Sequence, residues 1–212
     1  MAVLDLQEQE QLDTLKSWWK DNGNWVVGIV LIATMAMAGV RGWQYYQNKQ
    51  MTEAATLYQQ FVEQLSSNDA KRVNDAAAAV MDKYARTAYA PRAALIAAQV
   101  NENAKEPLRA KTQLQWVIEH ASEEGLKSVA SLRMASILLD EKDYAGAMKL
   151  LDAKHAASFD ALYADLKGDI FNAQGKAADA RAAYKQAFDK FDEKSSYRNL
   201  VQMKLDAFGA QK

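Results

Sequence analysis

The sequence contains no cysteine, only two prolines and nine glycines, and no run of basic residues longer than a pair. Without cysteine the chain can form neither a disulfide nor a thiolate metal site, and it cannot carry the lipidated cysteine of a lipoprotein. Because proline and glycine are the residues least compatible with a helix interior, their scarcity favours an all-α fold. The formal net charge of −1 over 212 residues argues against a nucleic-acid surface, which needs clustered basic side chains.

One long apolar segment lies near the N-terminus, at residues 24–43, and reads NWVVGIVLIATMAMAGVRGW. Residues 22–40 carry no charge, and a helix of that length spans about 28 Å, close to the hydrocarbon thickness of a bilayer. The segment is apolar on all sides rather than along one stripe. This pattern predicts a transmembrane anchor at residues 22–42, with the lipid bilayer as a partner. Aromatic residues form two membrane-interface belts: Trp18, Trp19 and Trp25 at its N-terminal side, and Trp43, Tyr45 and Tyr46 at its C-terminal side.

Two other interpretations of the apolar segment are a buried core helix and a cleaved signal peptide. Ala36-Met37-Ala38 has the small-x-small pattern of a cleavage site, placed before Gly39. However, the leading segment of a signal peptide is net positive, whereas this one is net negative, so an uncleaved anchor is preferred. The charged residues in it are Asp5, Glu8, Glu10, Asp13, Lys16, Lys20 and Asp21.

The orientation of the anchor is not decided by charge, because Lys16 and Lys20 before it are matched by Arg41 and Lys49 after it. A tail of residues 1–21 followed by one anchor and a large domain at residues 43–212 is typical of a protein with a cytoplasmic N-terminus. Thr34, Ala38 and Gly42 fall on one helix face, which predicts a transmembrane packing face. The alternative is that small residues are simply common in membrane helices.

In residues 43–212, helical stripes alternate with short breaks, the first at Ser66-Ser67-Asn68-Asp69. Pro91 and Pro107 open two helices, and Gly125 closes the second of these. The segment ADLKGDIFNAQGKAADARAAYKQAF has the spacing of the tetratricopeptide signature, and shifts of 33 and then 37 residues reach weaker copies. The pattern predicts a tetratricopeptide-repeat-like α-solenoid of about four helix pairs with a C-terminal capping helix.

The chain resembles the YfgM family, the ancillary subunit of the bacterial SecYEG translocon. The resemblance covers essentially the whole sequence and is clearest in LKSWWKDNGNWVVGIVL, GWQYY, SLRMASILLDEKDYAGAMKLLD, YADLKGDIFNAQGKAADARAAY and VQMKLDAF. It implies a single-span inner-membrane protein whose C-terminal domain is periplasmic. It also implies association with the SecYEG translocon and with the membrane-anchored periplasmic chaperone PpiD, and a role in transferring exported chains to periplasmic chaperones.

No catalytic residue, metal site or cofactor is expected, and the protein is not expected to be an enzyme. His120 and Glu124 have the spacing of a metal pair, but a third ligand at helical spacing is missing. His155 has no partner nearby in the sequence. Neither a glycine-rich phosphate loop nor a Gly-x-Ser-x-Gly motif is present.

The first helix of each pair in such a stack lines its concave side, which predicts a groove for a partner segment or a nascent exported chain. The groove would be apolar in its middle and acidic at its C-terminal end. The alternative is that at least half of its leucines belong to the hydrophobic core. The predicted residues are Leu95, Gln99, Val129, Leu132, Ser136, Leu139, Leu162, Asp165, Asp169 and Asn172.

The function predicted from these patterns is that of a membrane-tethered protein-interaction module associated with the Sec translocon. Two alternatives stay open at this stage. One is a membrane-bound regulator of an envelope stress response. The other is a membrane scaffold that self-associates through the face of Thr34, Ala38 and Gly42.

Overall fold

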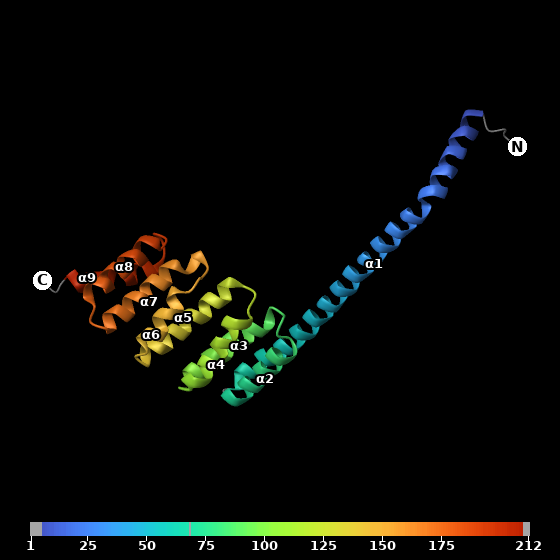
Figure 1. Ribbon diagram of the computed structural model, residues 1–212. Coiled ribbons are helices and arrows are strands. Elements are labelled where there is room, and N and C mark those ends of the chain that lie inside the picture. Colours follow the sequence, from blue (N-terminus) through green and yellow to red (C-terminus); the bar gives the residue numbers. More distant parts are fainter. Residues whose placement is uncertain (1–5, 68, 210–212) are drawn as a thin grey trace. The chain divides into compact units, whose positions relative to one another are not determined.

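The computed structural model describes residues 6–67 and 69–209, and within these ranges all regular structure is helical (Figure 1). This confirms the predicted all-α fold. The chain divides into two compact units, Met1–Gln50 and Met51–Lys212, each described here by itself. The start of the predicted tail, Asp5 included, and Asn68 of the first predicted break lie outside the described residues, as do the last three residues of the chain.

The first unit consists of the N-terminal part of helix α1 (Leu6–Gln64). Among the described residues, α1 is the one helix long and apolar enough to cross a membrane, and almost none of its apolar stretch is buried. The six aromatic residues of the predicted interface belts are all at least half exposed. The hydroxyl of Thr34, on the predicted packing face, donates to the carbonyl oxygens of Val30 and Leu31, so this polar group is satisfied within the helix.

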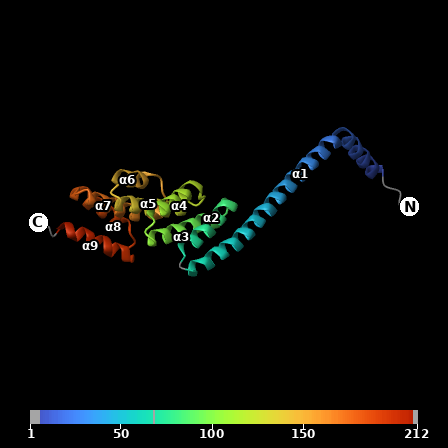
Figure 2. The same ribbon diagram turned by 90° about the horizontal axis from the view of Figure 1, so that it is seen from below.

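The second unit is a stack of helical hairpins. Within residues 51–67 and 69–209 it contains four helix pairs and a final helix, as the sequence predicts (Figures 1 and 2). After the C-terminal part of α1 the helices are α2 (Ala70–Lys83), α3 (Tyr89–Asn103), α4 (Pro107–His120), α5 (Glu124–Asp140), α6 (Tyr144–Asp152), α7 (Asp160–Ala173), α8 (Ala177–Lys190) and α9 (Ser196–Gly209). Short 3₁₀ turns lie at Leu65–Ser67 and Ala157–Phe159.

Local sequence explains several of these boundaries. Asp69 caps α2, since its carboxylate accepts from the backbone N–H groups of Lys71 and Arg72, and Pro107 is the first residue of α4. The prediction for Gly125 is wrong, because α4 already ends at His120 and Gly125 lies in the first turn of α5. A loop of three residues is enough to end α4, so a glycine is not needed there.

The core of the second unit forms four hydrophobic clusters that follow one another along the stack. Alanines dominate the helix crossings: Ala93, Ala94, Ala97 and Ala98 of α3 are all fully buried. Such small side chains let neighbouring helices approach closely, and larger residues fill the remaining space. Each hairpin therefore packs mainly against its neighbours, as in other repeat proteins.

Candidate functional site

The predicted groove lies on helices α3, α5 and α7, which contact one another along the stack (Figure 1). All ten predicted residues keep part of their surface accessible to solvent, and Gln99, Ser136 and Asn172 are exposed. The structure therefore presents these residues on three adjacent helices. Their role in binding remains a prediction.

The apolar middle of this surface is shared with the core. Leu95 packs against the cluster formed by α3, α4 and α5, and Leu132 and Leu139 pack against the next cluster along the stack. All three side chains are only partly buried, as are Val129 and Leu162. These leucines thus stabilise the hairpins and leave a limited apolar surface for a ligand.

The acidic end of the predicted groove is an internal ion-pair cluster. Nζ of Lys204, on α9, donates to both carboxylates: it lies 2.9 Å from Asp165 Oδ1 and 2.7 Å from Asp169 Oδ1. Tyr184 donates its hydroxyl to Asp169 at 2.8 Å. One lysine therefore offsets half of the negative charge at the predicted acidic end of the groove.

The pKa shifts in this cluster follow from its burial and from its hydrogen bonds. Burial raises the pKa of the Asp165 carboxyl, although the hydrogen bond from Lys204 opposes this shift. Burial opposes the charge of Lys204 as well, yet the hydrogen bonds to Asp165 and Asp169 raise its pKa. Burial and then the bond to Asp169 raise the pKa of Tyr184. The ammonium of Lys204 is therefore charged throughout the neutral range.

A cleft of about 460 Å³ lies beside the predicted groove, at the C-terminal ends of α3 and α5. Ser136 is the residue of the predicted set that lines it. Arg133 crosses from α5 to α3, where it donates to the carbonyl oxygen of Leu95 at 3.0 Å and to Glu102 at 2.8 Å. Two of the five N–H groups of its guanidinium are thus used within the protein.

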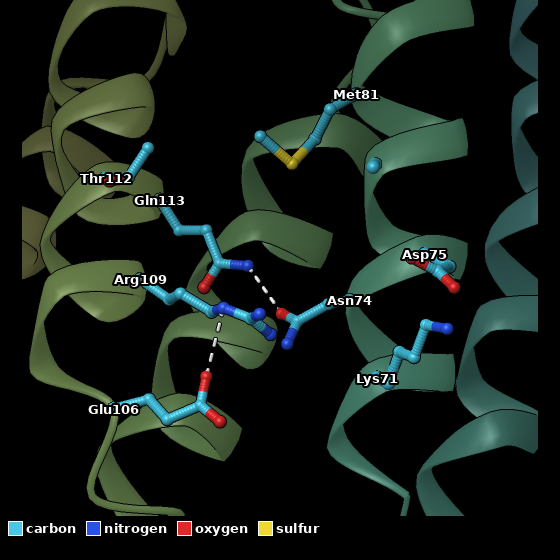
Figure 3. A pocket seen from close by; sticks show the side chains of 9 residues that line it. Lys71, Asn74, Asp75, Met81, Glu106, Arg109, Thr112 and Gln113 are labelled. Carbon is cyan, nitrogen blue, oxygen red and sulfur yellow. Dashed lines mark hydrogen bonds and ion pairs between the residues drawn. The ribbon is translucent and has the colours of Figure 1, made fainter.

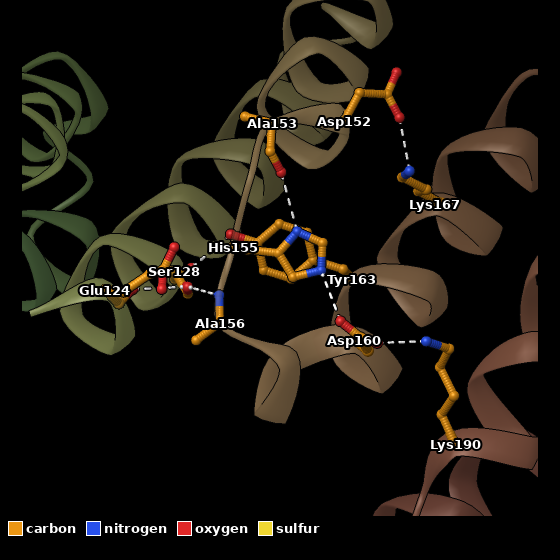
Figure 4. Close-up of polar contacts among 10 residues, drawn as sticks. All are labelled: Glu124, Ser128, Asp152, Ala153, His155, Ala156, Asp160, Tyr163, Lys167 and Lys190. Carbon is orange, nitrogen blue, oxygen red and sulfur yellow. Dashed lines mark hydrogen bonds and ion pairs between the residues drawn. The ribbon is translucent and has the colours of Figure 1, made fainter.

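Both histidines make contacts within the protein, and Figure 4 shows those of His155. The ring of His155 stacks on Tyr163 with centroids 3.8 Å apart, and its Nε2 lies 3.1 Å from Asp160 Oδ1. Asp160 also accepts from Lys190 of α8, and this hydrogen bond lowers the pKa of the carboxyl. His120 stacks on Trp116. Across the described ranges, no group of three or more His, Cys, Asp or Glu side chains is placed to hold a metal ion.

The hydroxyl of Ser128, near His155 and Tyr163, is engaged in hydrogen bonds within the protein. It donates to the carbonyl oxygen of Glu124 at 2.8 Å and accepts from the backbone N–H of Ala156 at 3.0 Å. Tyr163 donates to the Ser128 carbonyl oxygen at 3.1 Å. These bonds fix the segment between α6 and α7 against α5, which is a structural task.

A second cleft, which the sequence analysis missed, opens between α2 and α4 (Figure 3). Asn101 of α3 hydrogen-bonds to two of its lining residues. It is a fully buried polar residue, and the other buried residues of α3 are alanines and Pro91. In the sequence, the feature that could have indicated this site is a polar residue at a core position of an apolar helical stripe. Its partners, Asn74 and Gln113, are 27 and 12 residues away, which is why the cleft itself could not be inferred.

Known proteins with similar sequences extend these observations. Residues 16–210 match the family of the tetratricopeptide repeat-like domain. A protein of Neisseria gonorrhoeae described as "Ancillary SecYEG translocon subunit" is 32% identical over 206 residues, covering 95% of this chain and 97% of the relative. A protein of Escherichia coli with the same description is 29% identical, with 94% and 95% covered. One of Haemophilus influenzae is 27% identical, with 86% and 89% covered.

Proposed function

Because the chain belongs to the family of ancillary SecYEG translocon subunits, we propose that it is a membrane-tethered protein-interaction module acting beside the protein-export channel. The observation that carries this proposal is the extent of the match. Similarity to relatives with that description runs through the apolar helix and the helical stack alike. A tetratricopeptide repeat-like stack is a binding architecture rather than a catalytic one, which supports a non-enzymatic role.

The tether is the apolar part of α1. In this proposal residues 1–21 are a cytoplasmic tail, residues 22–42 span the inner membrane, and residues 43–212 form a periplasmic domain. The length and exposure of the apolar stretch fit a single-pass membrane protein. Tethering raises the effective concentration of the domain near the channel to about the millimolar range, so modest affinities suffice for transient contacts.

The partners in this proposal are the SecYEG translocon, the chaperone PpiD and nascent exported chains. The exposed positions of α3, α5 and α7 form the contact surface for PpiD or for a segment of an exported chain. Through these contacts the protein helps to transfer exported chains to the periplasmic chaperones. The partly buried Val129, Leu132 and Leu162 supply apolar area there, while Gln99 and Asn172 supply polar contacts.

The proposal is tested in two steps with the full chain in its membrane. First, a tagged chain is purified in mild detergent and the amount of co-purified SecY is measured. Second, a photoreactive amino acid replaces Gln99 on α3, and crosslinks are probed with antibodies against PpiD and against a stalled secretory chain. Both Gln99 and the control position, Gln115 on α4, are exposed glutamines.

We expect SecY to co-purify above the level of an unrelated single-span protein, and we expect crosslinks from Gln99 but not from Gln115. Absence of SecY would contradict the association with the translocon. Equal crosslinking from both positions would contradict the choice of contact surface while leaving the association intact.

A further inference from the structure

The cleft between α2 and α4 has a volume of about 650 Å³, which is within the range of ligand-binding pockets in proteins (Figure 3). Both helices pack against α3, whose Asn101 hydrogen-bonds to one lining residue of each helix. From α2 the lining residues include Asn74, Ala78 and Met81, and from α4 they include Thr112 and Gln113.

Three carboxamides form a closed network at this cleft. Nδ2 of Asn101 donates to Asn74 Oδ1 at 2.9 Å and to Gln113 Oε1 at 2.7 Å. Asn74 Nδ2 donates back to Asn101 Oδ1 at 2.8 Å, and Gln113 Nε2 donates to Asn74 Oδ1 at 2.7 Å. Since Asn101 is fully buried, these bonds offset the desolvation of its amide and fix the other two side chains.

The network leaves hydrogen-bonding capacity on the two residues that line the cleft. An asparagine or glutamine amide can donate two hydrogen bonds and accept two. Among the described residues, Asn74 Nδ2 and Gln113 Nε2 each donate one bond, and Gln113 Oε1 accepts one. One N–H of each residue and one lone pair of Gln113 are therefore available to a ligand, in orientations held by the buried Asn101.

One residue of an extended peptide matches this arrangement, because its own N–H donor and C=O acceptor point to the same side of the chain. The walls add apolar contacts from Met81 and Ala78. The charges around the cleft balance: Arg109 pairs with Glu106 at 3.1 Å, and Lys71 is matched by Asp75. A balanced rim gives no preference for a charged ligand.

We propose that the cleft between α2 and α4 binds the main chain of an extended, uncharged peptide segment through the carboxamides of Asn74 and Gln113. This site is separate from the surface of α3, α5 and α7. Peptide binding in the cleft and association with the translocon are measured separately. A chain that fails to co-purify with SecY can still bind the peptide.

The test uses the full chain in lipid nanodiscs, with the side-chain amides of asparagine and glutamine labelled with ¹⁵N. The probe is the capped peptide acetyl-Ser-Ala-Leu-Ala-Ser-amide, titrated to millimolar concentration. Its control is the same peptide with the three central backbone nitrogens methylated. Methylation removes the three central main-chain donors and keeps the side chains.

We expect the amide signals of Asn74 and Gln113 to shift to saturation with the unmethylated peptide, and the methylated peptide to bind at least tenfold more weakly. Ala78→Trp fills the cleft from an exposed position and should weaken binding at least tenfold. Gln113→Ala should do the same, but it also removes a partner of the buried Asn101, so Ala78→Trp is the variant that decides. Ala178→Trp, at an exposed position of α8, and Gln115→Ala should bind as the wild type does.

The proposal is overturned if the amide signals do not shift, if the methylated peptide binds equally well, or if Ala78→Trp leaves the affinity unchanged. Equal binding of both peptides would point to recognition of the leucine side chain alone. In each of these outcomes the translocon association could still hold, because its measurement is the co-purification of SecY.

Discussion

At the scale of single residues, the contact between Gly168 and Tyr184 decides how closely α7 and α8 approach. Gly168 is buried, and a Cβ added there would lie 2.5 Å from the Cδ1 and Cε1 atoms of the tyrosine ring. The ring is itself buried, and its hydroxyl is held by Asp169. It therefore has no room to move aside without breaking a hydrogen bond.

We predict that Gly168→Ala destabilises the folded stack by about 1–3 kcal/mol, as expected for overpacking of a tight core. The measurement is urea unfolding of the purified full chain, followed by circular dichroism. Gly125→Ala is the matched control, since the nearest atom to its added Cβ is 3.9 Å away. That change should be neutral or stabilising by up to about 1 kcal/mol. Equal losses in both variants would contradict the proposed role of the close contact.

Residue-level predictions from the sequence succeed where the cause is local. Gly168 and Tyr184 belong to the segment with the tetratricopeptide spacing. Asp69 belongs to the first predicted break, and it is recognisable as a cap because its partners are its own neighbours in the chain. The contacts of Lys204 with Asp165 and Asp169 join residues 39 and 35 positions apart. Such pairings depend on how the hairpins stack, so the sequence alone predicts an acidic surface where the structure has an ion-pair cluster.

At the scale of elements, the turns inside three successive hairpins are built alike. Lys105, Lys142 and Gly175 all adopt a positive φ, at 61°, 63° and 73°. In each turn the following residue donates its N–H to the carbonyl five positions back, as Glu106 does to Asn101 at 2.8 Å. The spacings of 37 and 33 residues equal those of the weaker sequence copies. The glycine is present only in the last turn, which explains why the sequence indicates that repeat clearly and the others poorly.

Helix α9 packs on the end of the stack through Val201, Leu205 and Phe208, and Lys204 adds several polar contacts. Besides the two carboxylates, Nζ of Lys204 lies 5.2 Å from the centre of the Tyr184 ring. We predict that Lys204→Met destabilises the stack by about 1–3 kcal/mol, because it leaves two partly buried carboxylates without their cation. Adding Asp165→Asn should recover part of this loss. The measurement is urea unfolding of the two variants and the wild type.

A lysine on the neighbouring helix provides the control. Lys185 also forms an ion pair, with Asp189, but both side chains are more than half exposed. Lys185→Met should therefore change the stability by less than about 0.5 kcal/mol. If the two lysine variants lose the same amount, the attachment of α9 does not depend on the burial of its ion pair.

At the scale of the whole molecule, the anchor and the stack were predictable to different degrees. Length and composition are sufficient to indicate a membrane span, because the bilayer sets a simple requirement on both. The orientation of the span depends on charge asymmetry, which is absent here: two basic residues lie close to it on either side. The side of the membrane that holds the stack must therefore be measured.

The absence of cysteine makes that measurement direct, since one introduced cysteine is unique. Ser17 and Ser122 are both exposed, one in the predicted tail and one between α4 and α5. With a membrane-impermeant maleimide on intact spheroplasts, we predict labelling of Ser122→Cys and no labelling of Ser17→Cys. After permeabilisation both should react. The opposite pattern would place the stack in the cytoplasm. A Ser17→Cys chain that stays unlabelled after permeabilisation, with a correspondingly lower mass, would instead show that the apolar segment is removed as a signal peptide.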